Sequence, residues 1–352
     1  MTSLHIGNHI INNNSKAFIV AEISANHLHN FDLTVNTIKA AKDSGADAIK
    51  VQTYTPDTLT IDVDNEYFTI KNGSPWDGNT YYNLYKEAHM PWDWQPKLQK
   101  IAEDLGLVFL STPFDVTAVD FLEDLNIPAY KVASFEITDI PLIRYIASKG
   151  KPIILSTGIA TLREIEEVVG VCRNAENDKI ALLKGTTTSV HPAAISEANL
   201  RTITDMKSRF DVVIGLSDHT RGNSAAIAGV SLGARIIEKH FILDRNLGGP
   251  DSSFSIEPHE FSKMVQAIRE AEKALGEVSY ALTENAKDSR IYSRSLFIVR
   301  DIKKGEILTK DNIKSIRPHY GLHPRNLDSI LGKKIKSDVL KGTPLSWDII
   351  ID

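Results

Sequence analysis

Several short apolar segments of this 352-residue sequence contain or end in residues that could do chemistry. Two of these segments carry a lysine, Lys50 in AIKVQT and Lys131 in AYKVAS. A lysine inside an apolar strand is costly unless an anion or a carboxylate pairs with it. Neighbouring segments end in the hydroxyl residues Ser134, Ser156 and Thr157. A helix is predicted to begin just after Gly158. Because helix N-terminal amides and ammonium groups both favour phosphate or carboxylate, this set predicts an anion site.

A carboxylate and two histidines end further apolar segments. Glu22 follows FIVA and could be a general acid or base, or form a salt bridge with Lys50 or Lys131. Each lysine has a structural alternative to anion binding. It could form a salt bridge with a neighbouring carboxylate, or its aliphatic side chain could extend so that the ammonium group reaches solvent. His219 and His240 could share a divalent metal and leave positions open for substrate oxygens. A hydrogen-bonded structural histidine is the alternative for either one alone.

The elements that would position these residues follow a regular alternation. Eight short segments rich in β-branched residues alternate with longer segments whose apolar residues have helical spacing. The predicted strands begin at Phe18, Ala48, Leu107, Ala129, Pro152, Ile180, Asp211 and Arg235. Eight alternations over about 250 residues favour an α/β fold of the closed (β/α)8 type, a TIM barrel, over an open doubly wound sheet. The reacting groups of such a barrel come from the carboxyl ends of its strands, where these polar residues lie.

The alternation ends with a predicted helix from Pro258 to Gly276. We therefore assign residues 1–280 to the barrel, 281–293 to a polar linker and 294–352 to a small β-rich domain with Gly turns. That domain is too small to have a large core of its own. The one long gap between strands, Tyr54 to Met90, is predicted to be an extended loop on the catalytic face.

Composition excludes several classes of partner. Asp and Glu number 45 against 40 Lys and Arg, for a formal charge of −5, so nucleic acid and anionic lipid are not expected partners. No apolar run approaches the ~18 residues of a membrane helix, and the N-terminal residues do not resemble a signal peptide. Cys172 is the only cysteine, which excludes a cysteine-ligated zinc cluster and is typical of a reducing compartment. We expect a soluble, cytoplasmic protein.

The motifs AEISANH, KVQTYTPDTL, STPFD, YKVASFEITD, PIILSTG, IGLSDHT, EKHF, GGPDSSFS, IRPHYGLHP and KGTPLSWD together resemble the sialic acid (nonulosonate) synthase family. The resemblance covers nearly the whole chain, and SANH and VQTYTPDTL are most similar to the branch that makes pseudaminic acid. It implies a phosphoenolpyruvate-binding barrel with a C-terminal antifreeze-like (SAF) domain, in a domain-swapped homodimer. It also implies condensation of phosphoenolpyruvate with an open-chain N-acetylated amino sugar, 2,4-diacetamido-2,4,6-trideoxy-L-altrose, to give a nine-carbon 2-keto acid and phosphate.

The resemblance also implies roles for individual residues, and Glu22 is the expected catalytic carboxylate. The phosphoenolpyruvate contacts would be Lys50, Thr112, Lys131, Ser134, Ser156, Gly158 and Thr187. The sugar-facing residues would be Gln52, Glu136, Asp251 and, from the partner subunit's SAF domain, Arg317. His219 and His240 would bind a divalent metal, with manganese (Mn²⁺) expected and magnesium or cobalt as alternatives. One stretch departs from the family: GTTTSVHPAA has Gly185 where a cysteine is usual.

Three other functions remain as alternatives. A synthase for legionaminic or N-acetylneuraminic acid would share the metal and phosphoenolpyruvate sites and differ in its sugar contacts. A non-catalytic sugar- or ice-binding protein would have no use for two histidines beside an anion site. A lyase resembling the class II aldolases would not release phosphate.

Overall fold

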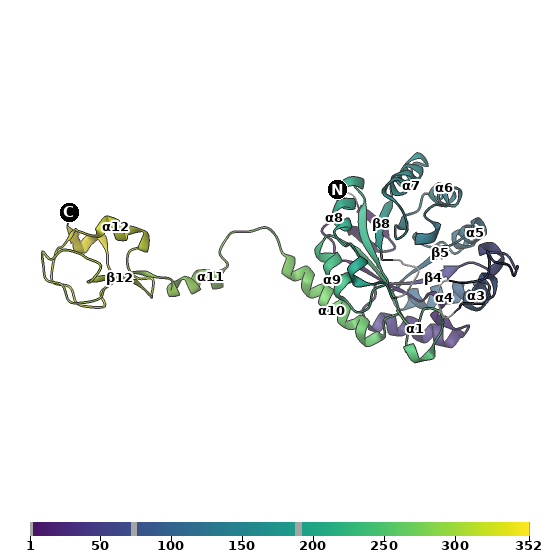
Figure 1. Ribbon diagram of the computed structural model, residues 1–352, viewed down its shortest axis with the longest axis horizontal. Helices are drawn as coiled ribbons and strands as arrows, with labels where there is room; N and C mark the ends of the chain where they lie inside the picture. Colours follow the sequence, from purple (N-terminus) through teal and green to yellow (C-terminus); the bar gives the residue numbers. More distant parts are fainter. Residues whose placement is uncertain (1–2, 72–75, 187–191, 352) are drawn as a thin grey trace. The chain divides into compact units, whose positions relative to one another are not determined.

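The computed structural model of the chain describes residues 3–71, 76–186 and 192–351. The chain divides into two compact units, Met1–Gly276 and Glu277–Asp352. The first unit is a closed barrel of eight parallel strands surrounded by helices (Figure 1). The predicted (β/α)8 barrel is therefore confirmed. Its strands are β3 (Phe18–Glu22), β4 (Ala48–Thr53), β5 (Val108–Pro113), β6 (Tyr130–Val132), β7 (Ile153–Ser156), β8 (Ile180–Gly185), β9 (Val213–Asp218) and β10 (Ile236–His240), and each overlaps one of the eight predicted segments.

The strand register determines which residues meet at the carboxyl ends. The strands follow one another around the barrel in chain order, and β10 pairs with both β9 and β3 to close it. Glu22 on β3 is paired with Lys50 on β4 and with His240 on β10. Three ionisable side chains from separate segments are therefore adjacent at one end of the barrel.

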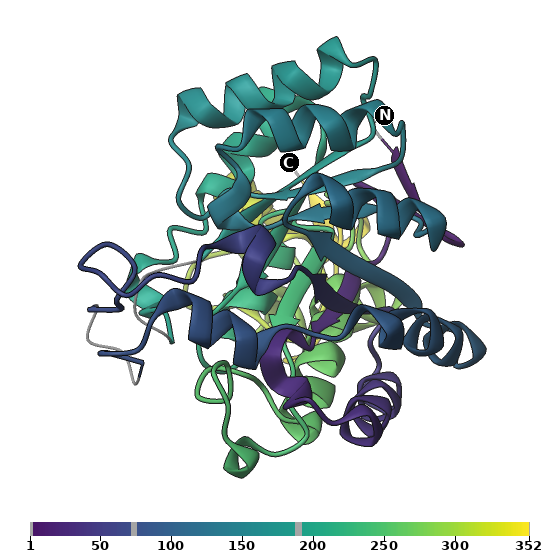
Figure 2. The same ribbon diagram turned by 90° about the vertical axis from the view of Figure 1, so that its right-hand side faces the viewer.

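Helices surround the barrel on its outside (Figures 1 and 2). They are α1 (Phe31–Asp43), α4 (Gln95–Asp104), α5 (Val116–Asp124), α6 (Ile140–Ser148), α7 (Leu162–Asn174), α8 (Thr202–Phe210), α9 (Ser224–Ser231) and α10 (Pro258–Leu275). Side chains cap several of them: Asn30 accepts a hydrogen bond from the backbone of α1, and Thr161 and Glu164 form a capping box on α7. The predicted helix from Pro258 corresponds to α10.

Short helices follow the strands that carry the polar residues. Three of them are 3-10 helices: η1 (Ser24–His27) after β3, η3 (Ser134–Glu136) after β6 and η5 (Arg245–Leu247) after β10. The long connection from β4 to α4 contains α2 (Pro56–Leu59), α3 (Tyr81–Ala88) and η2 (Trp92–Trp94), and η4 (Ile195–Glu197) precedes α8. These segments form the rim around the carboxyl ends of the strands.

An antiparallel hairpin precedes the barrel and was not predicted from the sequence. It consists of β1 (Ser3–Ile6) and β2 (His9–Asn12). Its buried side chains Leu4, Ile6 and Ile11 belong to the same apolar cluster as the inward-facing residues near the amino ends of the barrel strands, such as Phe18 and Ile236. The hairpin therefore fills the end of the barrel opposite the polar residues.

The second unit is β-rich, as expected, and has a small apolar core. It contains β11 (Ser295–Ile298), β12 (Ile313–Ile316), β13 (Lys334–Ile335) and β14 (Ile350–Ile351), paired in two antiparallel ladders. Its helices are α11 (Glu284–Ser289), η6 (Arg290–Tyr292), η7 (Pro324–Asn326), α12 (Leu327–Ile330) and η8 (Trp347–Ile349). Its core includes Leu296, Ile313 and Leu345. Across both units, none of the helices in the described residues has the length and apolarity required to cross a membrane.

Candidate active site

A cavity of about 330 Å³ lies at the carboxyl ends of the barrel strands. Most of the site residues expected from the sequence line it: Glu22, Lys50, Gln52, Lys131, Ser134, Glu136, Ser156, His219, His240 and Asp251. Two more hydrogen-bond to residues of its wall. Thr112 accepts a bond of 3.2 Å from Lys50, and the backbone amide of Gly158 donates one of 3.2 Å to Ser134. The fold therefore brings these separate motifs to one place.

Two lysines and two carboxylates form a buried ionic network in this cavity. Lys50 forms an ion pair with Glu22, and its Nζ lies 3.9 Å from an oxygen of Glu238. Lys131 Nζ lies 3.6 Å from the other oxygen of Glu238 and donates to the carbonyl of Val132. All four ionisable side chains are buried. An anion site and a salt bridge were the two interpretations of each lysine. The network has features of both, because each lysine lies near a carboxylate and both line the cavity.

The network separates the pKa values of its two carboxyl groups. Burial raises the pKa of Glu22 to about 7, although attraction to Lys50 opposes the rise. Burial would also raise the pKa of Glu238, but Lys131 and Lys50 outweigh it and lower that pKa to about 2. Burial lowers the pKa of Lys131, whereas for Lys50 the nearby carboxylates outweigh burial and raise it. Glu22 is thus the member of the network that can exchange a proton near neutrality.

The hydroxyl group of Ser156 lines the same cavity as the two lysines. Ser156, at the end of β7, is 1% exposed, and its Oγ has no hydrogen-bond partner among the described residues. A buried hydroxyl of this kind is costly unless a ligand or water bonds to it. Gly185 allows the backbone to close in here, since a Cβ on it would lie 2.6 Å from the Cα of Gly158. The departure from the family's usual cysteine therefore coincides with a close backbone approach.

The two histidines lie on neighbouring strand ends, as expected. The ring centroids of His219 and His240 are 5.1 Å apart, and Phe254 packs against both rings. An oxygen of Asp251 lies 3.8 Å from His240 Nδ1. No group of three or more His, Cys, Asp or Glu side chains within residues 3–71, 76–186 and 192–351 forms a complete metal site. Two imidazoles and a nearby carboxylate beside a cavity nevertheless fit a divalent ion whose remaining ligands are water or substrate oxygens.

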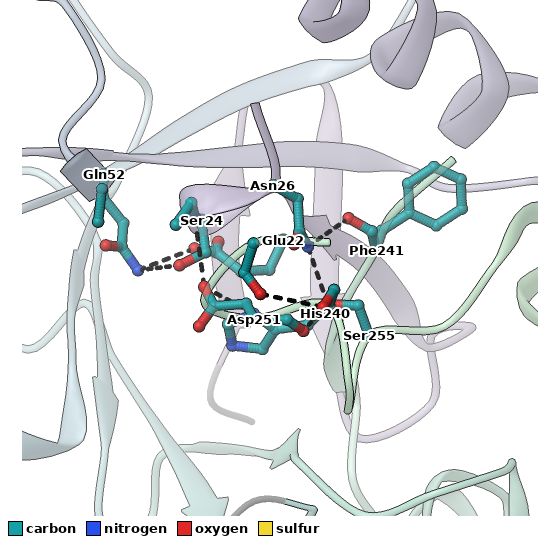
Figure 3. Close-up of polar contacts among 12 residues, drawn as sticks. Glu22, Ser24, Asn26, Gln52, His240, Phe241, Asp251 and Ser255 are labelled. Atoms are coloured by element: carbon teal, nitrogen blue, oxygen red, sulfur yellow. Dashed lines mark hydrogen bonds and ion pairs between the residues drawn. The ribbon is translucent and has the colours of Figure 1, made fainter. Parts of the chain in front are cut away.

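Three of the expected sugar-facing residues, Gln52, Glu136 and Asp251, line the cavity. Gln52 donates hydrogen bonds to Glu22 and to Ser24, while Asp251 accepts one of 3.3 Å from the backbone of Ala25 (Figure 3). Burial raises the pKa of Glu136, which follows β6, to about 7. From the long β4–α4 connection, Tyr85 lines the cavity, whereas Tyr67 is exposed. The long loop therefore supplies part of the wall, as predicted.

Two expected residues are not placed in this cavity. Arg317 is exposed in the second unit, directly after β12. Thr187 lies outside the described residues. Their expected roles in binding remain predictions.

Several residues that line the cavity had been assigned no role in the site from the sequence. Glu238, between the two lysines, is the most important, and Ser217 donates a hydrogen bond of 3.2 Å to it. The period of two along β10 placed Glu238 on the same face as His240, which was the available signal. Ser24 is one of the polar residues that follow the first predicted strand, but its place in the cavity depends on how the turn after β3 folds, and that of Phe254 depends on the loop after β10.

Outside the barrel wall, a second ion pair supports the histidine strands. Lys239 and Asp218 are both buried, are paired in the strand register and lie 2.7 Å apart. Lys239 also donates to the carbonyl of Thr220, and Asp218 accepts from the backbone and the hydroxyl of Thr220. These bonds fix the backbone on either side of His219 and next to His240.

Comparisons with known proteins agree along the whole chain. The NeuB family matches residues 37–280, and the SAF domain matches residues 293–350. The chain is 44% identical to the pseudaminic acid synthase of Campylobacter jejuni subsp. jejuni, over 97% of this chain and 98% of that protein. It is also 44% identical to the pseudaminic acid synthase of Helicobacter pylori, over 94% and 97%. Among solved structures, the N-acetylneuraminic acid synthetase of Leptospira borgpetersenii matches with a TM-score of 0.73 and 30% identity, over 82% of this chain and 95% of that one. The chain therefore belongs to the NeuB family and carries a SAF domain at its C-terminal end.

Proposed function

We propose that this chain is a pseudaminic acid synthase, which condenses phosphoenolpyruvate with 2,4-diacetamido-2,4,6-trideoxy-L-altrose and releases phosphate. The proposal draws on the identity with the two pseudaminic acid synthases. The observation that carries it is the charge of the cavity. Lys50 and Lys131 both line the cavity, and Glu22 and Glu238 are the carboxylates that lie near them. The two ammonium groups can pair with the charged oxygens of a small polyanion, and the raised pKa of Glu22 leaves that carboxyl group able to exchange a proton near neutrality.

In this proposal the lysines and hydroxyls hold phosphoenolpyruvate at the base of the cavity. Lys50 and Lys131 pair with its charged oxygens, and the partnerless hydroxyl of Ser156 supplies a hydrogen bond. Thr112, Ser134 and the amide of Gly158 lie next to these groups and complete the expected binding set. The sugar then lies above, between Gln52, Glu136 and Asp251.

The reaction forms one carbon–carbon bond and replaces the carbon–oxygen bond to phosphate at C2 with a carbon–oxygen bond to water. The C3 carbon of phosphoenolpyruvate attacks the aldehyde carbon of the open-chain sugar, which leaves C2 electron-deficient. Water adds to C2, and phosphate then leaves with its bridging oxygen to give the 2-keto acid. Glu22 takes the proton of that water, because its pKa near 7 lets it accept a proton in neutral solution.

His219 and His240, with Asp251 nearby, would hold a divalent metal ion, and manganese is the ion we propose. When bound, the ion would polarise the aldehyde oxygen of the sugar. The residues of the chain orient the sugar and provide the proton acceptor. We further propose a domain-swapped homodimer in which the exposed Arg317 reaches the sugar in the partner subunit, and a cytoplasmic location, where the single buried Cys172 would stay reduced.

Phosphate release is the experiment that tests the proposal. The protein is incubated with phosphoenolpyruvate and manganese, with the diacetamido-trideoxy-altrose, N-acetylmannosamine and the acceptor sugar of the legionaminate synthases in parallel. We expect release with the altrose sugar alone. Release with N-acetylmannosamine instead would place the chain with the neuraminate synthases. Release only with the acceptor sugar of the legionaminate synthases would place the chain with those enzymes. No release with any of the three would contradict the proposed activity.

A further inference from the structure

Ser24 adopts a backbone conformation that is unusual for its position. Its φ of 49° lies in the left-handed region, which residues with a Cβ adopt at a cost. Asn126 and Asp211 also have positive φ, but both lie at the C-terminal ends of helices, where such a residue is an ordinary cap. Ser24 instead is the first residue of η1, two positions after the end of β3, and lines the cavity. Strained residues that persist in a cavity wall are often retained for function.

The Ser24 side chain has a defined partner in the cavity. Its Oγ accepts a hydrogen bond of 2.9 Å from Nε2 of Gln52, and the residue is 7% exposed. Gln52 Nε2 also donates to Glu22 at 3.2 Å, so both hydrogens of the amide are directed to the β3 end (Figure 3). Ser24 therefore fixes which way the Gln52 amide points.

This arrangement leaves two hydrogen-bonding groups for a ligand. Because Nε2 of Gln52 faces Ser24 and Glu22, its Oε1 is the end of the amide that remains to accept a hydrogen bond. Ser24 uses Oγ as an acceptor, so its hydroxyl hydrogen remains to be donated, and no acceptor for it is found among the described residues. One acceptor and one donor side by side complement the N–H and C=O of an acetamido group.

We propose that Ser24 determines specificity for the amino sugar, by fixing the Gln52 amide and donating its hydroxyl hydrogen to an acetamido carbonyl. This inference rests on the proposed function, since the acetamido groups belong to the proposed acceptor. The hydroxyl is the reason why a serine occupies a left-handed position that glycine would occupy without strain. A buried donor that is left unpaired also discriminates strongly against a sugar that lacks the carbonyl.

Two substitutions at this position separate the hydroxyl from the strain. Ser24→Ala keeps the Cβ and the strain but removes the hydroxyl, whereas Ser24→Gly removes both. We expect both variants to raise the KM for the diacetamido sugar about 5–10-fold, as expected for one lost hydrogen bond, and to leave the KM for phosphoenolpyruvate unchanged. Ser24→Gly should melt at a higher temperature than Ser24→Ala, because glycine removes the backbone strain and alanine keeps it. A purely structural serine would change stability without changing the sugar KM.

A double-mutant cycle and a binding assay complete the test. Gln52→Ala should have a smaller effect in the Ser24→Ala background than in the wild type, because both residues act on one group of the sugar. Ser231→Ala, which removes an exposed hydroxyl on α9, is the matched control and should change neither KM. An unchanged sugar KM in both Ser24 variants overturns the inference. If the wild type releases no phosphate, the proposed function fails. Calorimetric titration of the sugar still decides this inference, since equal Kd values for wild type and Ser24→Ala overturn it.

Discussion

Glu22 and Lys50 lie opposite each other in the register of β3 and β4, and their side chains form an ion pair inside the barrel. Lys50 also lies 3.9 Å from Glu238, so one ammonium group serves two carboxylates. Lys131 attracts Glu238 further, and the pKa of Glu238 is lowered while that of Glu22 is raised. The strand register thus places Glu22, whose pKa burial raises to about 7, beside the ammonium group of Lys50.

The first prediction concerns the pH dependence of activity. Burial raises the pKa of Glu22 to about 7, so its ionised, proton-accepting form is lost as pH falls through 7. We expect kcat/KM for phosphoenolpyruvate to rise with pH and to level off above about 7. In Glu22→Gln this inflection should disappear and turnover should fall about 100-fold or more. The substrate phosphate also titrates, and its contribution is subtracted first. If an inflection near pH 7 then persists in Glu22→Gln, the inflection belongs to a group other than Glu22.

The second prediction concerns the anion site. Lys131→Met removes one of two ammonium groups that face the cavity and keeps the apolar stem. A charge-assisted hydrogen bond contributes about 1.5–3 kcal/mol, so the KM for phosphoenolpyruvate should rise roughly 10–100-fold. The sugar KM should change little. Lys100→Met, which removes an exposed lysine of a surface pair on α4, is the control. A sugar KM that rises as much as the phosphoenolpyruvate KM would show that Lys131 acts on the whole cavity.

The third prediction concerns the metal. Dialysis against a chelator should abolish phosphate release, and added manganese should restore it. His240→Ala should lose turnover and manganese binding by calorimetry, with an unchanged circular dichroism spectrum. His259→Ala serves as the control, because that histidine is exposed near the start of α10. Normal turnover of His240→Ala after metal removal would refute the proposed metal site.

The fourth prediction concerns the SAF domain. Arg317→Ala should raise the KM for the sugar and leave the KM for phosphoenolpyruvate unchanged, because the arginine is proposed to contact the sugar alone. Arg325→Ala, another exposed arginine of the same unit, should have neither effect. An unchanged sugar KM in Arg317→Ala counts against the swapped arrangement.

The fifth prediction concerns the buried pair of Lys239 and Asp218. Removing one partner leaves a buried charge uncompensated, so Lys239→Met should lower the free energy of unfolding by about 3–5 kcal/mol. Urea denaturation of the wild type and the variant measures this change. Lys239→Met combined with Asp218→Asn should lose less than the sum of the single losses, because no charge remains unpaired. Additive losses would mean that the two side chains do not stabilise each other.

The sequence predicted the barrel well because of the way its strands are buried. Strands of a parallel barrel are covered on both sides, so they read as short runs of Val, Ile and Leu, and each run was recognisable. The β1–β2 hairpin was missed because its strands have four residues each and only one side is buried. Short strands of this kind have little periodicity from which to recognise them.

The sequence predicted which residue types form the site and at which strand ends they lie, but it did not predict every contact between them. Lys50, Lys131 and Glu22 stood out because charge is rare in apolar segments. The position of Glu238 between the two lysines could not be predicted, because it depends on side chains that meet across the barrel interior. The left-handed conformation of Ser24 could not be predicted either, because a serine at a strand end usually has an ordinary backbone.

The β1–β2 hairpin has a consequence for the order in which the chain folds. Leu4 and Ile11 are buried against residues that include Ile236, and β3 closes the barrel by pairing with β10. The hairpin is therefore synthesised more than 200 residues before its complete binding surface exists. Contacts of such long sequence separation form slowly, so we expect the hairpin to be among the last parts of the barrel to become protected from hydrogen exchange during refolding.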